Sequence, residues 1–325
     1  MVTGIGLFSG GLDSILAVRL LQHQNIHIEA VSFVTPFFVP EQAKKSVEQL
    51  GVPLHIIDIS EKHIEMLKNP KHGYGRNMNP CIDCHALMFN QAGWLMKKKG
   101  ASFLFSGEVL GERPMSQNKN SLKVVARESG FEEFIIRPLS ARLLPVTKPE
   151  KEGLVDREKL LDIHGRSRKR QIELTKQLGI THYPDPAGGC RLTDPAFSNR
   201  LRDLLKNNKK TLKRDMELLS VGRHLRINRN VKIIVGRNEK ENARIESLSE
   251  KGDIILTIED IPSPIVIIPC GTDDDTVSLA ASICVRYSDS QGDEPVLVSV
   301  LQDNMVKGKV YASACSQELL KDFII

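Results

Sequence analysis

The pattern that most constrains this chain is a glycine-rich hexapeptide near its start, Ser9-Gly10-Gly11-Leu12-Asp13-Ser14. A short apolar run, residues 5–8, precedes it, and apolar residues with helical spacing follow it over residues 14–23. This order predicts a strand, a tight turn and a helix. Glycine lets such a turn approach a ligand closely, and the N–H groups that begin a helix favour an anion. The hexapeptide therefore predicts a phosphate-binding turn, with a plain turn and an aspartate cap as the structural alternative.

Asp13 is the unusual member of this turn because a carboxylate beside a phosphate is repelled unless a cation lies between them. It therefore indicates either Mg²⁺ or a direct role in the reaction. The chain contains no GxxxxGK[ST] pattern, so the lysine of a Walker loop is missing. Ordinary γ-phosphoryl transfer is accordingly not expected.

The first part of the chain alternates strand and helix patterns. Further strands are predicted at residues 28–34, 54–59, 101–105 and 134–136, and helices at 41–50, 61–67 and 156–179. Strands separated by helices predict an α/β fold with a parallel sheet, in which ligands bind beyond the carboxyl ends of the strands. We therefore expect a first domain over residues 1–205.

The pattern changes after a predicted helix at residues 197–207. Strands are predicted at 231–235, 254–258, 265–268, 296–300 and 309–312, and a helix at 276–287. Several strands with one covering helix predict a second, smaller α+β domain, which we place at residues 209–325.

The net charge of +5 is unevenly distributed. Residues 202–244 hold 13 lysines and arginines against 5 acidic residues, whereas residues 251–325 hold 5 against 12. A basic stretch of this kind indicates either solvated helix faces or a surface that follows nucleic-acid phosphates. The candidate RNA contacts are Arg166, Arg168, Lys169, Arg170, Arg223, Arg226 and Arg237.

Three of the six cysteines occupy chemically suggestive positions. Cys81 and Cys84 form a CxxC pattern at the start of a predicted helix, and Cys190 follows a glycine-rich loop. Three converging thiolates would suit an iron–sulfur cluster with one open iron or an incomplete zinc site, whereas a cysteine pair could work through persulfide and disulfide chemistry. We expect Cys270, Cys284 and Cys315 to be buried small hydrophobes. We expect His85 to face solvent, with metal ligation or an RNA contact as the alternatives.

Three motifs in the first domain resemble those of a known enzyme class. The hexapeptide resembles the SGGxDS signature of PP-loop ATP pyrophosphatases, and Ser106–Gln117 and Ile136–Leu139 resemble two stretches of tRNA 4-thiouridine synthetases, over a region of about residues 1–205. The chain departs from that pattern at Glu112 and Arg113. The resemblance implies an adenine-nucleotide alpha hydrolase-like fold. It implies ATP contacts from Ser9, Gly10, Gly11, Leu12, Asp13, Ser14, Phe33 and Gly107.

The cysteine arrangement is similar to that of iron–sulfur-dependent tRNA thiolation enzymes, where a CxxC pair and a distant cysteine hold a [4Fe–4S] cluster. The resemblance implies that ATP and Mg²⁺ activate a uridine carbonyl of tRNA by adenylation and that sulfur then displaces AMP. The implied catalytic residues are Asp13, Cys81, Cys84 and Cys190, of which the three cysteines are the metal ligands. Free sulfide or a cysteine desulfurase would supply the sulfur. The motif order favours 4-thiouridine over 2-thiouridine.

The second domain resembles the NFACT-type RNA-binding domain. The resemblance rests on the segments Val221–Arg226, Ile234–Asn242 and Ala280–Ser288 and spans about Val221 to Tyr311. It implies that the domain binds tRNA by shape and backbone, since aromatic residues for base stacking are scarce there. A dimerisation or purely stabilising module is the alternative, and a homodimer stays open.

No apolar run reaches the ~18–20 residues that a membrane span needs, and the first residues lack the basic start of a signal peptide. We therefore expect a cytoplasmic protein without a membrane partner. Two rival functions remain: an ATP-dependent ligase or amidating enzyme acting on a small molecule, and a non-catalytic RNA-binding factor that uses ATP as a switch.

Overall fold

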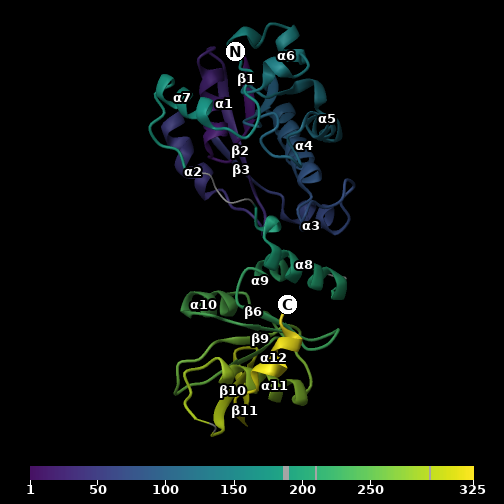
Figure 1. The fold of residues 1–325 in the computed structure, drawn as a ribbon, viewed down its shortest axis with the longest axis vertical. Helices are drawn as coiled ribbons and strands as arrows, with labels where there is room; N and C mark the ends of the chain where they lie inside the picture. The colour runs from purple at the N-terminus through teal and green to yellow at the C-terminus, as the bar shows by residue number, and fades with distance from the viewer. Residues whose placement is uncertain (186–189, 209–210, 293) are drawn as a thin grey trace. The chain divides into compact units, whose positions relative to one another are not determined.

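The computed structural model divides into two compact units, Met1–Thr193 and Asp194–Ile325. It describes residues 1–185, 190–208, 211–292 and 294–325 (Figure 1). Helix α8, Pro195–Asn207, belongs to the second unit, although the sequence boundary at residue 205 placed it in the first. Its attachment explains the difference, because Asp203 of α8 forms an ion pair with Arg226 of the second unit at 2.6 Å.

Among the described residues of the first unit, five strands form one sheet in the order β3-β2-β1-β4-β5. The strands are β1 (Thr3–Leu7), β2 (His27–Val34), β3 (Leu54–Asp58), β4 (Phe103–Ser106) and β5 (Ile135–Ile136). All neighbouring pairs are parallel, which confirms the predicted α/β class. The strand order reverses between β1 and β4, and ligands bind at such a reversal in open α/β sheets.

The helices of this unit cover both faces of the sheet (Figure 1). They are α1 (Leu12–Gln22), α2 (Glu41–Val47), α3 (Ser60–Lys68), α4 (Cys81–Lys99), α5 (Lys119–Ser129), α6 (Lys148–Lys151) and α7 (Lys169–Gln177). Side chains of β4 alternate between two cores: Phe103 and Phe105 pack with α1, whereas Leu104 packs with α4 and α5. Burial on both faces explains why these strands read as continuous apolar runs.

The region expected to be helical over residues 156–179 is helical only in part. It contains a 3-10 turn, Arg157–Lys159, and then α7. Between them the backbone pairs with the segments that leave the sheet: the amide of Ile163 donates to Leu139 O at 2.8 Å, and the amide of Gly165 donates to Leu110 O at 2.7 Å. These long-range hydrogen bonds replace helical ones and lead the chain along the loops beyond β4 and β5.

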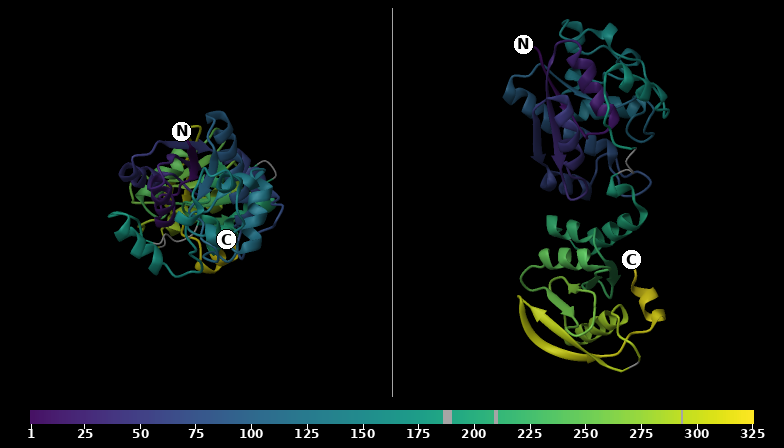
Figure 2. Two further views of the ribbon diagram at one scale, coloured as in Figure 1. Left: turned by 90° about the horizontal axis from the view of Figure 1, so that it is seen from above. Right: turned by 90° about the vertical axis from the view of Figure 1, so that its left-hand side faces the viewer.

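Among the described residues of the second unit, six strands form an antiparallel sheet in the order β11-β10-β8-β9-β7-β6. The strands are β6 (Arg223–Arg226), β7 (Lys232–Val235), β8 (Ile254–Thr257), β9 (Val266–Ile268), β10 (Val296–Gln302) and β11 (Met305–Ala312). Besides α8, the helices are α9 (Lys213–Leu218), α10 (Glu239–Ser247), α11 (Asp274–Arg286) and α12 (Gln317–Phe323). This confirms the α+β class, with the long β10–β11 hairpin at one edge (Figure 2).

Candidate active site

The glycine loop lies at the carboxyl end of β1 and leads into α1, as predicted. Gly10 has a left-handed φ of +78°, and the loop is held by its own hydroxyl groups: Ser14 Oγ donates to Gly11 O at 2.8 Å. Ser46 of α2 fixes it from outside, since its Oγ donates to Gly10 O at 2.8 Å. The loop is therefore a rigid turn whose shape is set before any ligand binds.

Gly107, directly after β4, packs against this loop. A Cβ atom at Gly107 would lie 2.4 Å from the carbonyl carbon of Asp13 and 2.5 Å from the amide nitrogen of Ser14. The two motifs, about a hundred residues apart in sequence, are thus in backbone contact at the point where the strand order reverses. Leu12 and Phe33, two of the expected ATP contacts, bury their side chains in the cores, so that only their backbone could contact a ligand.

Replacing Gly10 with alanine should destabilise the first unit more than the same change at Gly51. Both residues have positive φ, +78° and +63°, so both variants carry the strain of a left-handed alanine. Only at Gly10 would the new Cβ meet backbone, 2.4 Å from Gln42 O, whereas at Gly51 nothing described lies within 4 Å. Urea unfolding of the two variants measures the difference, and equal losses would contradict this role of Gly10.

Four charged or polar side chains gather around Asp13. Burial raises the pKa of the Asp13 carboxyl, and Arg168, Gln171 and Arg113 oppose that rise. Burial also raises the pKa of Glu112, and the nearby Asp13 carboxylate adds to the increase. Among the described residues, Asp13 Oδ1 has no hydrogen-bond partner. Two carboxylates, one of them unsatisfied, therefore lie beside a turn suited to an anion, as a site for phosphate with a divalent cation would require.

A buried ion network joins the Ser106-Gly107-Glu108 motif to the cysteine-bearing helix α4. Glu108 accepts from Arg137 Nε at 2.9 Å and from Ser106 Oγ at 3.0 Å, and it contacts His85 Nδ1 at 2.7 Å. Burial alone would raise the pKa of Glu108, but Arg137 and His85 hold it down at about 2. The expectation that His85 faces solvent is therefore wrong, because the ring turns inward to pair with Glu108.

Cys81 and Cys84 lie in the first turn of α4, and each has a side-chain nitrogen nearby. Asn79 Nδ2 donates to Cys81 Sγ at 3.2 Å, and His63 Nε2 lies 3.3 Å from Cys84 Sγ. His63 is fully buried, its ring packs against Phe37 and Phe38, and burial lowers its pKa to about 4. The sequence pattern gave no indication of His63, which belongs to no motif.

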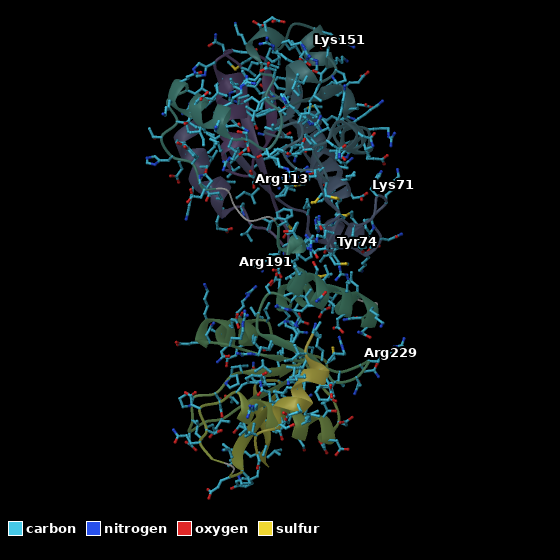
Figure 3. The ribbon with its side chains drawn as sticks, in the orientation of Figure 1. Lys71, Tyr74, Arg113, Lys151, Arg191 and Arg229 are labelled. Atoms are coloured by element: carbon cyan, nitrogen blue, oxygen red, sulfur yellow. The ribbon has the colours of Figure 1, made fainter. Side chains whose placement is uncertain are left out.

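Cys190 lies within electrostatic reach of the other two thiols. Burial raises the pKa of Cys84 well above its usual value, and Cys190 and Cys81 raise it further. Burial and Cys81 also raise the pKa of Cys190, and the backbone of Leu192 and the charges of Arg191 and Arg113 oppose that rise. Arg113 (labelled in Figure 3) therefore acts on both Asp13 and Cys190. Within the described ranges, no three His, Cys, Asp or Glu side chains form a recognisable metal-binding group.

The remaining cysteines lie in the second unit and differ from one another. Cys284 is fully buried, as expected, and Cys315 is partly buried. Cys270 is exposed, contrary to expectation, because the strand β9 ends at Ile268 and Cys270 lies in the turn that follows, with a left-handed φ of +66°. No helix in the described part of the chain is long and apolar enough to span a bilayer.

The predicted RNA contacts fall into two groups. Arg166, Lys169 and Arg170 are exposed, although Arg170 pairs with Asp162 at 2.6 Å. Arg223 stacks over Tyr287, with its guanidinium carbon 4.6 Å from the ring centroid. The other three predicted contacts have acidic neighbours within the protein. Arg226 binds Asp203 through two hydrogen bonds, and Arg237 pairs with Glu241, four residues further along the chain. Arg168 lies near Asp13. Figure 3 shows Arg229, which was not predicted, at the outer tip of the β6–β7 hairpin.

Comparison with known proteins finds a family that matches the second unit and curated proteins that are similar to about half of the chain. Residues 222–324 match the NFACT protein RNA binding domain. A probable tRNA sulfurtransferase of Anoxybacillus flavithermus is 26% identical over 194 residues, which cover 48% of this chain and 48% of that protein. The tRNA-specific 2-thiouridylase MnmA 1 of Fusobacterium nucleatum is 28% identical over 177 residues, covering 51% and 47%.

A solved structure, that of a 4-thiouridine synthetase–RNA complex with bound ATP, aligns with a TM-score of 0.37 at 20% identity, covering 55% of this chain and 41% of that chain. The chain spans about half the length of the curated relatives it matches. The chain is therefore similar to tRNA sulfurtransferases over about half of its own length, and its residues 222–324 match the NFACT protein RNA binding domain.

Proposed function

We propose that this chain is an ATP-dependent tRNA sulfurtransferase that adenylates a uridine carbonyl and replaces its oxygen with sulfur. One observation carries the proposal: Gly107 packs against the backbone of Asp13 in the glycine loop, and the next residue, Glu108, pairs with His85 at 2.7 Å, beside Cys84 on α4. The charge of Arg113 also acts, weakly, on both Asp13 and Cys190. A nucleotide and a sulfur nucleophile bound at these places would share one pocket of the first unit.

ATP would bind with its phosphates at the glycine loop, where the N–H groups at the start of α1 favour negative charge. Mg²⁺ fits the donors that are present, because it typically takes one or two carboxylates together with substrate phosphates. Asp13 and Glu112 would hold it, and it would neutralise charge on the phosphates. The unpartnered Asp13 Oδ1 is the observation that supports this assignment.

The reaction balances as two displacements. The uridine carbonyl oxygen attacks the α-phosphorus of ATP, an O–P bond forms, and the bond to pyrophosphate breaks. A sulfur nucleophile then forms a C–S bond, the C–O bond breaks, and AMP leaves. The glycine loop and Arg113 would bind the separating anions, and burial of the pocket would keep water from hydrolysing the adenylate.

The three cysteines fit a [4Fe–4S] cluster by the chemistry of the donor set. They are soft thiol ligands, and side-chain nitrogens of Asn79 and His63 lie within hydrogen-bond distance of two of the sulfurs. Hydrogen bonds to the sulfurs are common around such clusters. Cys81, Cys84 and Cys190 would hold the cluster, which would supply an open iron that binds sulfide. Persulfide chemistry between Cys190 and Cys81 or Cys84 is the rival use of the same thiols, and zinc is the third.

The substrate would be tRNA, with 4-thiouridine favoured over 2-thiouridine by the order of motifs. The match of residues 222–324 to an RNA-binding domain supports an RNA partner. Arg223 and the exposed Arg229 are the cations of that unit that we assign to phosphate contacts. We place the reaction in the cytoplasm, with free sulfide or a cysteine desulfurase as the sulfur donor.

The proposal is tested by the stoichiometry of the reaction. The purified chain, prepared without oxygen, is incubated with unmodified tRNA, ATP, Mg²⁺ and sulfide, and AMP, pyrophosphate and thiolated uridine are quantified. We expect one AMP and one pyrophosphate per thiolated uridine. Adenylation of a small molecule without any need for tRNA would support the ligase alternative, and ATP binding without pyrophosphate release would support the non-catalytic one.

Cys190→Ala should abolish thiolation and remove the visible absorption of an iron–sulfur cluster together. The matched control is Cys270→Ala, which removes an exposed thiol of the second unit and should change neither property. Absorption spectra and nucleoside mass spectrometry measure the two effects. Full thiolation by Cys190→Ala would contradict the assignment. Thiolation by a wild-type protein that holds no iron, lost in Cys190→Ala, would favour persulfide chemistry.

A further inference from the structure

The start of helix α7 lies beside the glycine loop although about 150 residues separate them in sequence. The extended segment before α7 is fixed by the hydrogen bond from Gly165 to Leu110 O and by a bridge between Leu110 and His164. These contacts bring Arg168 and Gln171, at the start of α7, next to Asp13. The basic run of residues 166–170 is therefore not a single surface.

Polar atoms at this place are buried and unsatisfied. Among the residues that the structure describes, Arg168 Nε, both amide atoms of Gln171 and Asp13 Oδ1 make no hydrogen bond of ordinary length and angle. The Gln171 amide still lies close enough to the Asp13 carboxyl to act as a weak donor that lowers its pKa. Gln171 is fully buried, with a relative exposure of 0%. A buried donor or acceptor without a partner destabilises the fold, because it has lost its hydrogen bonds to water. Such a group of atoms indicates a place where a polar ligand completes the hydrogen bonds.

Two arginines, Arg113 and Arg168, lie beside the two carboxylates at this place. The glycine loop has no lysine, so the positive charge that a Walker lysine gives to bound phosphates would come from another segment. Arg168 lowers the pKa of both Asp13 and Glu112, so its guanidinium lies near both carboxylates. A guanidinium group is suited to bind phosphate oxygens through two parallel N–H donors.

We propose that Arg168 and Gln171 complete the nucleotide site by binding the β- and γ-phosphates of ATP, which leave together as pyrophosphate. This deepens the proposed function and rests on it. Arg168 then has a different role from its exposed neighbours Arg166 and Lys169, which stay assigned to RNA. It supplies the positive charge that the lysine of a Walker loop provides elsewhere, and Gln171 holds a phosphate oxygen through its amide.

The test is calorimetric titration of the full chain with ATP, AMP and pyrophosphate, each with Mg²⁺ and without tRNA. Arg168→Ala should weaken the binding of ATP and pyrophosphate by about 10- to 100-fold, because a hydrogen bond to a charged group is lost, and it should leave AMP affinity unchanged. Arg168→Lys keeps the positive charge but loses the two parallel N–H donors of the guanidinium group. We therefore expect an intermediate loss of ATP and pyrophosphate affinity. Lys176→Ala, an exposed cation of the same helix, is the control and should change none of these affinities.

The outcomes are separable. Unchanged ATP and pyrophosphate affinity in Arg168→Ala would overturn the inference, and weaker tRNA binding by the same variant, measured separately, would return Arg168 to the RNA surface. Equal losses for AMP and ATP would overturn the assignment to the β- and γ-phosphates. If Arg168→Ala does not fold by circular dichroism, Arg168→Lys decides through the same three ligands. A wild-type chain that binds no ATP would instead refute the proposed function.

Discussion

Glu108→Gln is expected to lower the free energy of unfolding of the first unit by about 3 kcal/mol at neutral pH. The pKa of Glu108 falls from an ordinary value of 4.5 to about 2 in the fold, and every tenfold change in an acid dissociation constant corresponds to about 1.4 kcal/mol. The amide would accept weaker hydrogen bonds and would leave the buried Arg137 without its counter-charge. Breaking a buried ion pair in this way costs about 3–5 kcal/mol in other proteins.

The pH dependence of this effect has a definite sign. A carboxyl group whose pKa is lowered by folding stabilises the fold above its unfolded pKa and loses that contribution as the pH falls through the folded value. The difference between wild type and Glu108→Gln should therefore be full at pH 7 and should shrink between about pH 4.5 and 2. Denaturant unfolding at several pH values measures it, and the exposed Glu158→Gln is the control. Equal stability of wild type and Glu108→Gln at pH 7 would show that the network contributes nothing.

Asp13→Asn should abolish pyrophosphate release while the chain stays folded and becomes at least as stable. The Asp13 carboxylate is largely buried, its pKa is raised, and Oδ1 has no partner among the described residues, so ionised Asp13 is unfavourable for the fold itself. Such a group persists where catalysis requires it, and its removal trades activity for stability. The amide has nearly the same shape but no charge with which to hold Mg²⁺ or the reacting groups.

Two measurements check this expectation. Thermal unfolding compares Asp13→Asn with wild type and with Asp260→Asn, which removes an exposed carboxylate of the second unit. Pyrophosphate release is followed with tRNA and ATP. Retained pyrophosphate release by Asp13→Asn would remove Asp13 from the reaction. A large loss of stability would show instead that its role is structural.

The parallel sheet and the glycine loop could both be predicted from the sequence alone. Alternating apolar strands and helices predicted the parallel sheet, and the glycines of the hexapeptide predicted the turn that Gly10 forms with positive φ. The sequence could not predict the path of residues 160–168, because its backbone hydrogen bonds go to residues beyond β4 and β5 rather than to neighbours along the chain. That path is what separates Arg168 from the other basic residues.

Side-chain pairing explains most of the remaining differences. The pairing of Arg237 with Glu241 was visible in the sequence, because oppositely charged residues four apart interact along a helix or its first turn. The pairing of Arg226 with Asp203 was not, since it spans 23 residues and two elements. His85 differs from the expectation for the same reason, because its partner Glu108 comes from another segment.

The most direct test of tRNA thiolation by this chain is a mass-spectrometric survey of the nucleosides in tRNA from a strain that lacks this gene, with wild type and Cys190→Ala restored in parallel. We expect one thiolated uridine to disappear, with 4-thiouridine favoured. We also expect the wild-type gene to restore this nucleoside and Cys190→Ala to fail. An unchanged set of thiolated nucleosides in the deletion strain, when no other enzyme makes the same product, would contradict the claim that this chain thiolates tRNA.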